Sequence, residues 1–199
     1  MAERDLESYR RKGPSASTRD LLTVVRGAGV RGSTVLDVGG GIGAVVHELL
    51  GAGGTSATLV DASPAYLGAA RSEAERRGMG DRVTFRAGDF TALAQEIPTA
   101  DVVTLDKVVC CYPDMHRLLS AAAGRTTRLL GMVYPRDSWW VRAAMAVVNA
   151  LFLVRRTTFR VYVFRNAAIE QVVADAGLVP RYRKRGFTWV VALYERRPR

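Results

Sequence analysis

Short runs of β-branched and other apolar residues alternate along the chain with longer stretches in which apolar residues recur at helical spacing. This alternation is typical of an α/β domain, in which helices connect buried strands. Because only three residues, 185–187, separate the last two apolar runs, we expect these runs to form a hairpin. The runs predict strands over 33–38, 57–61, 82–86, 101–105, 128–134, 178–184 and 188–194, and helices over 17–26, 43–50, 64–77, 139–154 and 166–176.

The most apolar stretch of the chain, residues 138–154, is interrupted by Arg142 and Asn149. Its uninterrupted runs are far shorter than the roughly 18–20 apolar residues that a bilayer-spanning helix needs. The pattern therefore predicts a helix that is buried or forms a lid, and no transmembrane segment. Residues 1–12 are charged and lack the apolar core of a secretory signal, so we expect a cytoplasmic protein.

The length and cysteine content favour an ordinary globular domain. A chain of 199 residues can bury a sizeable core without disulfides or a structural metal. Its two cysteines, Cys110 and Cys111, are adjacent, and it has only two histidines. These numbers exclude a disulfide framework and a four-ligand zinc site built from Cys and His, and we expect no metal centre.

The net charge of +10 lies in the C-terminal half of the chain. Residues 101–199 hold 17 basic and 7 acidic side chains, whereas residues 1–100 hold 12 of each. Such an excess fits a nucleic-acid partner, an anionic membrane surface or an acidic substrate. However, 26 of the 29 basic residues are arginine, which also fits the coding bias of a GC-rich genome. No basic run is interleaved with stacking aromatic residues, which argues against nucleic acid.

A glycine-rich turn, Gly39-Gly40-Gly41-Ile42-Gly43, follows the first predicted strand, and Asp37 precedes it by two positions. Glycines allow the backbone to turn sharply and to approach a ligand without a Cβ atom in the way. Amides at the start of the following helix favour a polar or anionic ligand. By itself, such a turn also fits a tight strand-to-helix connection that binds nothing.

Acidic residues close the next two predicted strands. Asp61 stands where dinucleotide-binding folds place the acid that accepts hydrogen bonds from ribose hydroxyls, although it also fits a position before a helix. Asp89, within Gly88-Asp89-Phe90, follows the third strand. The glycine spacing is G-x-G-x-G and not the G-x-G-x-x-G of dinucleotide folds, which makes an NAD-dependent enzyme the weaker interpretation.

In this combination of motifs, residues 9–194 resemble the class I S-adenosylmethionine-dependent methyltransferases. The resemblance implies a single domain over residues 1–199 with an α/β, Rossmann-like, doubly wound fold. Its mostly parallel, seven-stranded sheet would have an antiparallel last strand and helices on both faces. The resemblance also implies an N-terminal helical cap over about residues 1–30 and a lid insertion over about residues 136–160.

The resemblance further implies how S-adenosyl-L-methionine is bound. Asp37 and the glycine turn would hold its methionine part, Asp61 its ribose, and residues 88–90 its adenine. The pair that follows the fourth strand matches the motif that closes the cofactor pocket and faces the substrate. An early tyrosine belongs to a segment similar to the N-terminal stretch that folds over the cofactor in many members. The full cofactor-binding set is Tyr9, Asp37, Gly39, Gly40, Gly41, Gly43, Asp61, Ala62, Gly88, Asp89, Phe90, Asp106 and Lys107.

Candidates for contact with the methyl acceptor come after the fourth strand. Tyr112 and His116 are predicted as a base or an orienting donor, although His116 also fits an exposed position on a helix. Cys110 and Cys111 lack the preceding Pro or Thr of cytosine C5-methyltransferases, so we interpret them as small buried hydrophobes. Asp106 is not followed by the Pro-Pro-aromatic signature of base N-methyltransferases, which again argues against nucleic acid.

A Tyr-Pro pair precedes the apolar stretch at 139–154, a layout similar to that of magnesium-protoporphyrin methyltransferases. The stretch fits a lid, and it also fits packing on the core or on an oligomer partner. A lid would suit an apolar acceptor with a carboxylate, because arginine binds carboxylates bidentately. The arginines near its ends are Arg136, Arg142, Arg155 and Arg156.

Together, these features predict an enzyme of the EC 2.1.1 class that transfers a methyl group, in line, from S-adenosyl-L-methionine to a small, apolar metabolite. Two alternatives stay open at this stage. One is an RNA or protein methyltransferase that uses the basic half of the chain, and the other is a non-catalytic protein that binds the cofactor. Whether the chain forms a homo-oligomer also stays open.

Overall fold

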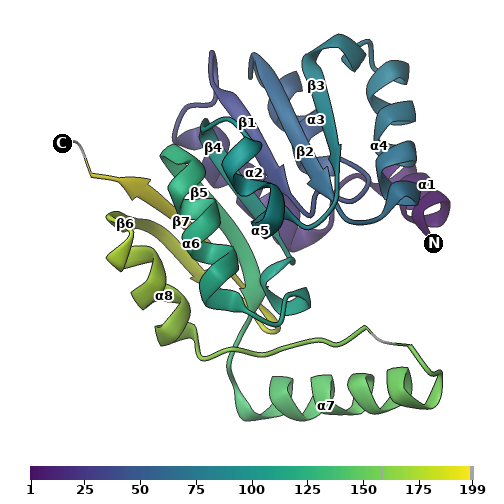
Figure 1. The fold of residues 1–199 in the computed structure, drawn as a ribbon, viewed down its shortest axis with the longest axis vertical. Coiled ribbons are helices and arrows are strands. Elements are labelled where there is room, and N and C mark those ends of the chain that lie inside the picture. Colours follow the sequence, from purple (N-terminus) through teal and green to yellow (C-terminus); the bar gives the residue numbers. More distant parts are fainter. Residues whose placement is uncertain (158, 198–199) are drawn as a thin grey trace.

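One seven-stranded sheet, with strand order β3-β2-β1-β4-β5-β7-β6, forms the centre of the computed structural model (Figure 1). The structure describes residues 1–157 and 159–197. The strands are β1 (Thr34–Val38), β2 (Ser56–Asp61), β3 (Val83–Ala87), β4 (Ala100–Asp106), β5 (Thr126–Pro135), β6 (Leu178–Arg185) and β7 (Trp189–Arg196). Each predicted strand is confirmed, with ends shifted by no more than two residues.

Helices connect the strands, as the alternating pattern predicts. The α-helices are α1 (Ala2–Lys12), α2 (Ala16–Gly27), α3 (Ala44–Gly51), α4 (Pro64–Arg76), α5 (Phe90–Leu93), α6 (Met115–Arg125), α7 (Trp139–Val154) and α8 (Asn166–Asp175). Three short 3-10 helices are η1 (Gly80–Arg82), η2 (Ala94–Glu96) and η3 (Val109–Cys111).

Strand direction agrees with the predicted mixed sheet. The strands β1 to β5 pair in parallel, and β7 pairs antiparallel with both β5 and β6. The last two strands are joined directly, so the predicted hairpin is confirmed. In the parallel part, Val38 is paired with Val60, and Asp61 with Ala87. This register brings the carboxyl ends of β1, β2 and β3 to one edge of the sheet.

Two apolar cores cover the two faces of the sheet. Neighbouring residues of a strand point to opposite faces, so Val35 joins one core and Leu36 the other. The helices α2, α3 and α4 supply the first core, and α5, α6 and α8 supply the second. This arrangement confirms a doubly wound sheet with helices on both faces.

The first two helices are fastened to the domain by polar contacts. Arg10 of α1 donates a hydrogen bond to Glu73 of α4 at 2.8 Å. Ser15 begins α2, and its hydroxyl accepts a hydrogen bond from the backbone amide of Thr18. From there, α2 crosses β5 and β7. The N-terminal segment thus lies against the sheet and α4.

Helix α7 stands apart from both cores (Figure 1). It follows β5 at the carboxyl edge of the sheet, and a segment at 159–165 runs back beside it. The predicted helix is confirmed. Of the two alternatives for it, burial is wrong, because Val141 is its only buried residue, and the lid stays a prediction. Among the described residues, no helix is both long and apolar enough to cross a membrane.

Candidate functional site

A cavity of about 340 Å³ lies at the carboxyl edge of the sheet, where β1, β2 and β3 end beside the segment that follows β4. Seven of the predicted site residues meet around it: Gly39, Asp61, Ala62, Gly88, Asp89, Phe90 and Tyr112. The other residues that line it are Val38, Val60, Val108, Cys111, Pro113 and Leu118. Most of these are apolar, so the cavity combines acidic groups with apolar walls.

The glycine turn between β1 and α3 packs too tightly for side chains. Gly39 has a φ of +63° and Gly43 a φ of +77°, a left-handed conformation that favours glycine. A Cβ atom on Gly39 would lie 2.5 Å from Val108 Cγ2, and one on Gly43 would lie 2.8 Å from His47 Cε1. Glycine is therefore required here on steric grounds, and the backbone of Gly39 faces the cavity.

Asp61 ties the glycine turn to the start of α4. Its Oδ2 accepts a hydrogen bond from the Gly41 amide at 2.9 Å, and its Oδ1 accepts one from the Ser63 amide at 2.8 Å. Each carboxylate oxygen has two lone pairs, so each can accept one more hydrogen bond. Because Asp61 lines the cavity, it can bind a ligand that carries hydroxyl groups.

Asp37 lies beneath the turn and is only 1% exposed. Its Oδ1 accepts a hydrogen bond from the Thr104 hydroxyl at 2.7 Å, whereas its Oδ2 has no hydrogen-bond partner among the described residues. Burial raises the pKa of Asp37 to about 8, and the negative charges of Asp106 and Asp61 act in the same direction. A Cβ atom on Gly40 would lie 2.6 Å from that Oδ2, so the turn closes directly over the carboxyl group.

Asp89 and Tyr112 form a polar wall of the cavity. The Tyr112 hydroxyl donates a hydrogen bond to Asp89 Oδ2 at 2.9 Å, and Asp89 Oδ1 accepts another from the Thr91 amide at 2.8 Å. Burial raises the pKa of Tyr112 above its ordinary value. The hydroxyl therefore stays protonated at neutral pH, and it is placed as a hydrogen-bond donor.

Asp106 and Lys107 connect the end of β4 to the start of α2. Lys107 has a φ of +64°, which is strained for a residue other than glycine. Its Nζ donates hydrogen bonds to the hydroxyls of Ser15 and Thr18, and the Thr18 hydroxyl donates to Asp106 Oδ2 at 2.6 Å. Neither residue lines the cavity, so the structure places this pair beside the predicted pocket and not within it.

The two adjacent cysteines differ in exposure. Cys110 is buried, whereas Cys111 is exposed and lines the cavity, so the prediction of two buried thiols is wrong for Cys111. Their Sγ atoms are 3.7 Å apart. The hydrogen bond with Cys111, together with burial, raises the pKa of the Cys110 thiol. Cys110 therefore stays a protonated thiol.

Tyr9 and His116 are two predicted site residues that the structure places outside the cavity. Tyr9 is buried between α1, α3 and α4, where its hydroxyl donates to Glu48 Oε1 at 3.0 Å and its ring stacks on His47. His116 lies on the first turn of α6 and borders a separate surface hollow with Ser120. Neither side chain lines the cavity. The roles of Tyr9 in cofactor binding and of His116 in acceptor binding therefore stay predictions that this cavity does not support.

Six residues that line the cavity were not predicted as site residues: Val38, Val60, Val108, Cys111, Pro113 and Leu118. Apart from Cys111, they form apolar walls. Nothing in the local sequence marks these positions as ligand-facing. For Val108, the one usable signal is its place directly after the strand-end pair at 106–107, at the edge where the strands end.

The cavity can hold a ligand that has hydroxyl groups and a flat apolar part. Asp61 supplies hydrogen-bond acceptors, and Val60, Phe90 and Leu118 supply apolar surface. Asp37 does not line the cavity, because the glycine turn covers its unpartnered oxygen. Among the described residues, no three His, Cys, Asp or Glu side chains are grouped as metal ligands would be.

Comparisons with known proteins agree with this geometry. Residues 35–128 match a family model described as a methyltransferase domain. This range contains Asp37, the glycine turn, Asp61, Asp89 and Tyr112. No curated protein matches the sequence.

Solved methyltransferase structures share the fold at low sequence identity. Magnesium protoporphyrin IX methyltransferase from Synechocystis PCC 6803, solved with bound SAH, has a TM-score of 0.71 and 22% identity, over 91% of this chain and 82% of that one. An O-methyltransferase family protein from Burkholderia thailandensis has a TM-score of 0.75 and 21% identity, over 98% and 59%. Geranyl diphosphate methyltransferase in complex with GPP and sinefungin has a TM-score of 0.72 and 16% identity, over 92% and 77%.

Proposed function

Starting from a chain whose residues 35–128 match a methyltransferase domain and whose fold is of the class I, S-adenosylmethionine-dependent type, we propose that this protein methylates a small, apolar acceptor. The reaction would belong to the EC 2.1.1 class. The observation that carries the proposal is the cavity at the carboxyl edge, where Asp61 and the glycine turn are joined by a hydrogen bond. The three similar structures named above are all methyltransferases.

The cofactor's nucleoside part would occupy the cavity. Asp61 would accept hydrogen bonds from the ribose hydroxyls, because its two oxygens keep free lone pairs toward the cavity. The apolar walls would flank the adenine ring, with Phe90 beside it. Asp89 would lie near the exocyclic amine, since Tyr112 and Thr91 leave part of its carboxylate free.

The glycine turn would bind the amino-acid end of the cofactor. Gly39, Gly40 and Gly41 would bring backbone atoms close to it, since the turn carries no side chain there. The unpartnered oxygen of Asp37 fits the positive charge of an ammonium group, which would offset the unfavourable burial of an ionised carboxylate. Asp106 and Lys107 would close this side indirectly, by fixing the start of α2.

When bound, S-adenosyl-L-methionine supplies a methyl group on a sulfonium centre. The chain's own residues would contribute mainly by positioning the acceptor, because alignment of the reacting atoms accounts for most of the acceleration of an in-line displacement. Tyr112 would orient the acceptor or the cofactor by accepting a hydrogen bond at its hydroxyl oxygen, because its single proton is donated to Asp89. It would not act as a base, because its pKa is raised. This arrangement favours an acceptor atom that needs no deprotonation, such as a carboxylate oxygen.

The two predicted accessory segments would serve the acceptor side. The cap at about 1–30 would act through α2, whose first turn is fixed to Lys107, and not through Tyr9. The lid at about 136–160 contains α7. The segment after α7 lies beside the cavity residue Cys111, because the Tyr162 amide donates to the carbonyl of the preceding Cys110 at 2.7 Å. An apolar acceptor would fit between the apolar lid segment and the apolar walls of the cavity.

Calorimetric titration of the purified protein with S-adenosylmethionine, S-adenosylhomocysteine and NAD, in parallel, tests the cofactor assignment. We expect micromolar binding of the two adenosyl sulfur compounds and no binding of NAD. The variant Asp61→Asn should weaken that binding about 10- to 100-fold, because hydrogen bonds to a charged group contribute about 1.5–3 kcal/mol. The matched control Asp81→Asn changes an exposed acid outside the cavity and should leave affinity unchanged.

Two results would contradict the proposal. Binding of NAD alone would mean that the glycine turn serves a dinucleotide. Wild-type affinity in a folded Asp61→Asn variant, verified by circular dichroism, would mean that the nucleoside does not contact this carboxylate.

A further inference from the structure

The outward face of α7 is apolar and exposed. Trp139 is 81% exposed, Val147 62% and Val154 80%, and Leu151 and Leu153 are exposed as well. Alanines at 143, 146 and 150 fill the same face at helical spacing, and Arg142 is its one charged residue. Isolated exposed apolar residues are common on protein surfaces, but a continuous face of this kind marks an interaction site.

The tip of the β6–β7 hairpin extends this apolar face. Phe187 is 80% exposed, and its ring stacks on Trp140 with ring centres 4.3 Å apart. We use the term α7 surface for Trp139, Val147, Leu151, Leu153, Val154 and Phe187. The α7 surface therefore combines two separate elements of the chain, a helix and a hairpin tip.

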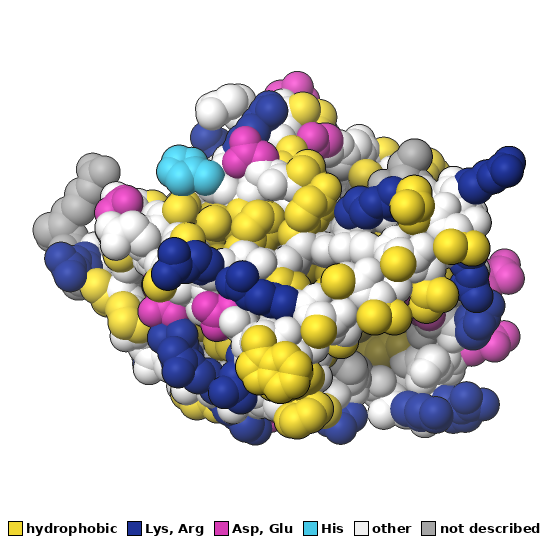
Figure 2. Space-filling model, turned by 90° about the horizontal axis from the view of Figure 1, so that it is seen from below, with side chains coloured by type: hydrophobic (Ala, Val, Ile, Leu, Met, Phe, Trp, Pro, Cys, Tyr) yellow, Lys and Arg dark blue, Asp and Glu magenta, His cyan; other side chains and the backbone are white. Residues whose placement is uncertain are grey.

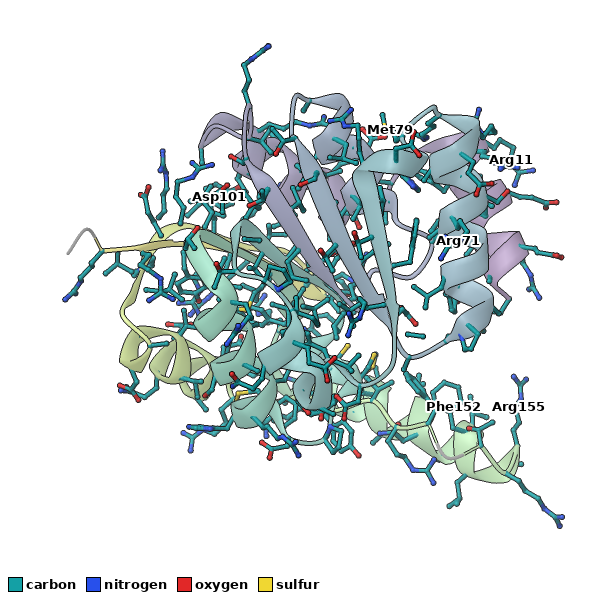
Figure 3. The ribbon with its side chains drawn as sticks, turned by 45° about the horizontal axis from the view of Figure 1, so that its top comes forward. Arg11, Arg71, Met79, Asp101, Phe152 and Arg155 are labelled. Atoms are coloured by element: carbon teal, nitrogen blue, oxygen red, sulfur yellow. The ribbon has the colours of Figure 1, made fainter. Side chains whose placement is uncertain are left out.

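The other face of α7 is held firmly by the returning segment. Asn149 exchanges two hydrogen bonds of 2.8 Å with the backbone of Val161, and Phe152 packs edge-on against Phe159. Figure 3 shows Phe152 near the end of α7 that is distant from the sheet, with Arg155 close by. Because Asn149 satisfies its polar groups on the inner face, the outer face carries only two hydrogen-bonding side chains, Arg142 and the indole of Trp139.

Positive charge surrounds the α7 surface. Residues 136–165 contain six arginines and a single acidic residue, Asp137. Arg142, Arg155 and Arg156 are exposed. Figure 2, which shows the molecule from the side of α7, has hydrophobic side chains across its middle and Lys and Arg side chains around them.

From this combination we propose that the α7 surface docks on an anionic lipid bilayer, with α7 lying in the interface plane. A helix of this kind buries its apolar face among the acyl chains while basic residues contact the lipid headgroups. Exposed Trp139 fits the headgroup level, where tryptophan is enriched. The proposal does not rest on the proposed methyl transfer, because docking needs neither cofactor nor acceptor.

The same observations disfavour two other occupants. A second copy of the chain would bring two strongly positive segments together, and like charges at an interface oppose association. A nucleic acid would neutralise the arginines but would leave the apolar side chains exposed to water. Of these three occupants, an anionic lipid surface is the one that matches both the charge and the apolar face.

Docking in this way would also orient the rest of the molecule. The helix α7 lies beyond the carboxyl edge of the sheet, on the side where the cavity is formed (Figure 1). The returning segment joins α7 to the backbone beside the cavity residue Cys111, through the hydrogen bond from the Tyr162 amide to the Cys110 carbonyl. The cavity edge would therefore face the lipid surface.

Flotation of the full chain with lipid vesicles tests the proposal. One set of vesicles contains phosphatidylcholine alone, and the other also contains phosphatidylglycerol as a minor component. We expect the wild-type protein to float with the second set and to bind the first set at least about tenfold more weakly, because each basic residue near an anionic surface contributes about a fivefold factor.

Two double variants separate the apolar and the charged contributions. Val147→Ser with Leu151→Ser should reduce binding at least about tenfold, because apolar area drives insertion. Arg142→Gln with Arg155→Gln should reduce it roughly 25-fold. The matched control is Arg11→Gln with Lys12→Gln, which removes the same charge from exposed positions on α1 and should leave binding close to that of the wild type. All substituted side chains are exposed, and circular dichroism verifies the fold.

Several outcomes would overturn the proposal. Failure of the wild type to float with anionic vesicles would do so directly. An equal loss in the control variant would show unspecific charge attraction. A dimer in light scattering that dissociates in the Val147→Ser, Leu151→Ser variant would assign the face to a second copy. Binding to RNA that the Arg142→Gln, Arg155→Gln variant loses, without binding to vesicles, would assign it to nucleic acid.

Discussion

The cavity edge and the α7 surface depart from the rules of stable folding in opposite ways. At the cavity edge, Asp37 buries a carboxylate oxygen without a partner among the described residues, and Lys107 adopts a strained backbone conformation. At the α7 surface, large apolar side chains are left in water. The cavity edge buries polar groups where apolar groups would give a more stable fold. The α7 surface exposes apolar groups where polar groups would be better solvated.

This difference indicates what each region lacks. A buried polar atom without a partner is stabilised by a ligand that supplies charge or a hydrogen bond, whereas an exposed apolar face is stabilised by a partner that removes it from water. Local departures of this kind are expected at functional sites, where stability is given up for binding. The cavity edge therefore fits a small polar ligand, and the α7 surface fits an extended apolar one.

The largest effect should come from Asp37→Asn. The pKa of Asp37 is about 8 in the folded protein and near 3.8 in the unfolded chain, so folding retains a proton that unfolding releases between these values. The free energy of unfolding of the wild type therefore falls as the pH rises through this window. That of the Asp37→Asn variant does not fall for this reason, because asparagine does not titrate. Between pH 5 and pH 8, the variant should gain up to about 4 kcal/mol relative to the wild type.

Urea denaturation at a series of pH values measures this difference, with Asp81→Asn, at an exposed acid outside the cavity, as the matched control. A pH-independent offset for Asp37→Asn would mean that the carboxyl is ionised in the fold. The cavity edge would then not contain the unfavourable buried group on which the comparison rests.

A smaller effect is expected for Glu73, a buried acid that is fully paired. It is 0% exposed, and it accepts hydrogen bonds from three arginines: Arg10, Arg76 and Arg77. Hydrogen bonds from Arg76 in particular lower the pKa of Glu73 well below its usual range. Glu73→Gln should destabilise the fold by about 3 kcal/mol, because three positive charges lose their common partner.

The control for this variant is Glu75→Gln on the exposed side of the same helix, which should change stability by less than about 0.5 kcal/mol. Unfolding free energies from denaturant titrations compare the two. If both variants unfolded with the free energy of the wild type, the ion pairs of Glu73 would not stabilise the fold. Pairing would then not distinguish Glu73 from the unpartnered Asp37.

The smallest effects on the free energy of unfolding are expected in α7. There the same substitution, valine to alanine, can be made on the buried and on the exposed face. Val141 is 0% exposed and Val147 is 62% exposed. Val141→Ala removes two buried methyl groups and should cost about 2 kcal/mol. Val147→Ala should be neutral within about 0.5 kcal/mol, since alanine also has the higher helix propensity. Thermal and denaturant unfolding without vesicles measure both, and equal losses would mean that another part of the protein covers Val147 in solution.

Much of the fold follows from local sequence patterns. Apolar runs mark central strands such as β1 and β4, because strands buried on both faces leave no polar alternation. The mostly exposed β6 is marked instead by its place before the short turn to β7, and Ser63-Pro64 marks the start of α4. The gathering of Asp61 and Asp89 is also predictable, since parallel strands place their carboxyl ends at one edge. These features depend on neighbours in sequence or on simple sheet geometry.

The remaining features depend on contacts between distant segments. Tyr9 contacts Glu48 and His47 of α3 because α1 packs against the rest of the domain. No local sequence pattern predicts that packing. The apolar content of α7 predicts burial, yet the helix lies off the sheet, since its inner face is satisfied by the returning segment. Which face of an apolar helix is covered cannot be inferred from composition alone.

The position of β7 has a consequence for the synthesis of the chain. It lies between β5 and β6, and both of these strands precede it in sequence. While a ribosome adds residues 136–188, the mostly buried strand β5 has one edge with no partner strand. Open apolar edges are templates for pairing with other chains. The growing chain therefore passes through a period when it is most prone to aggregate, and this period ends only when β7 emerges and inserts.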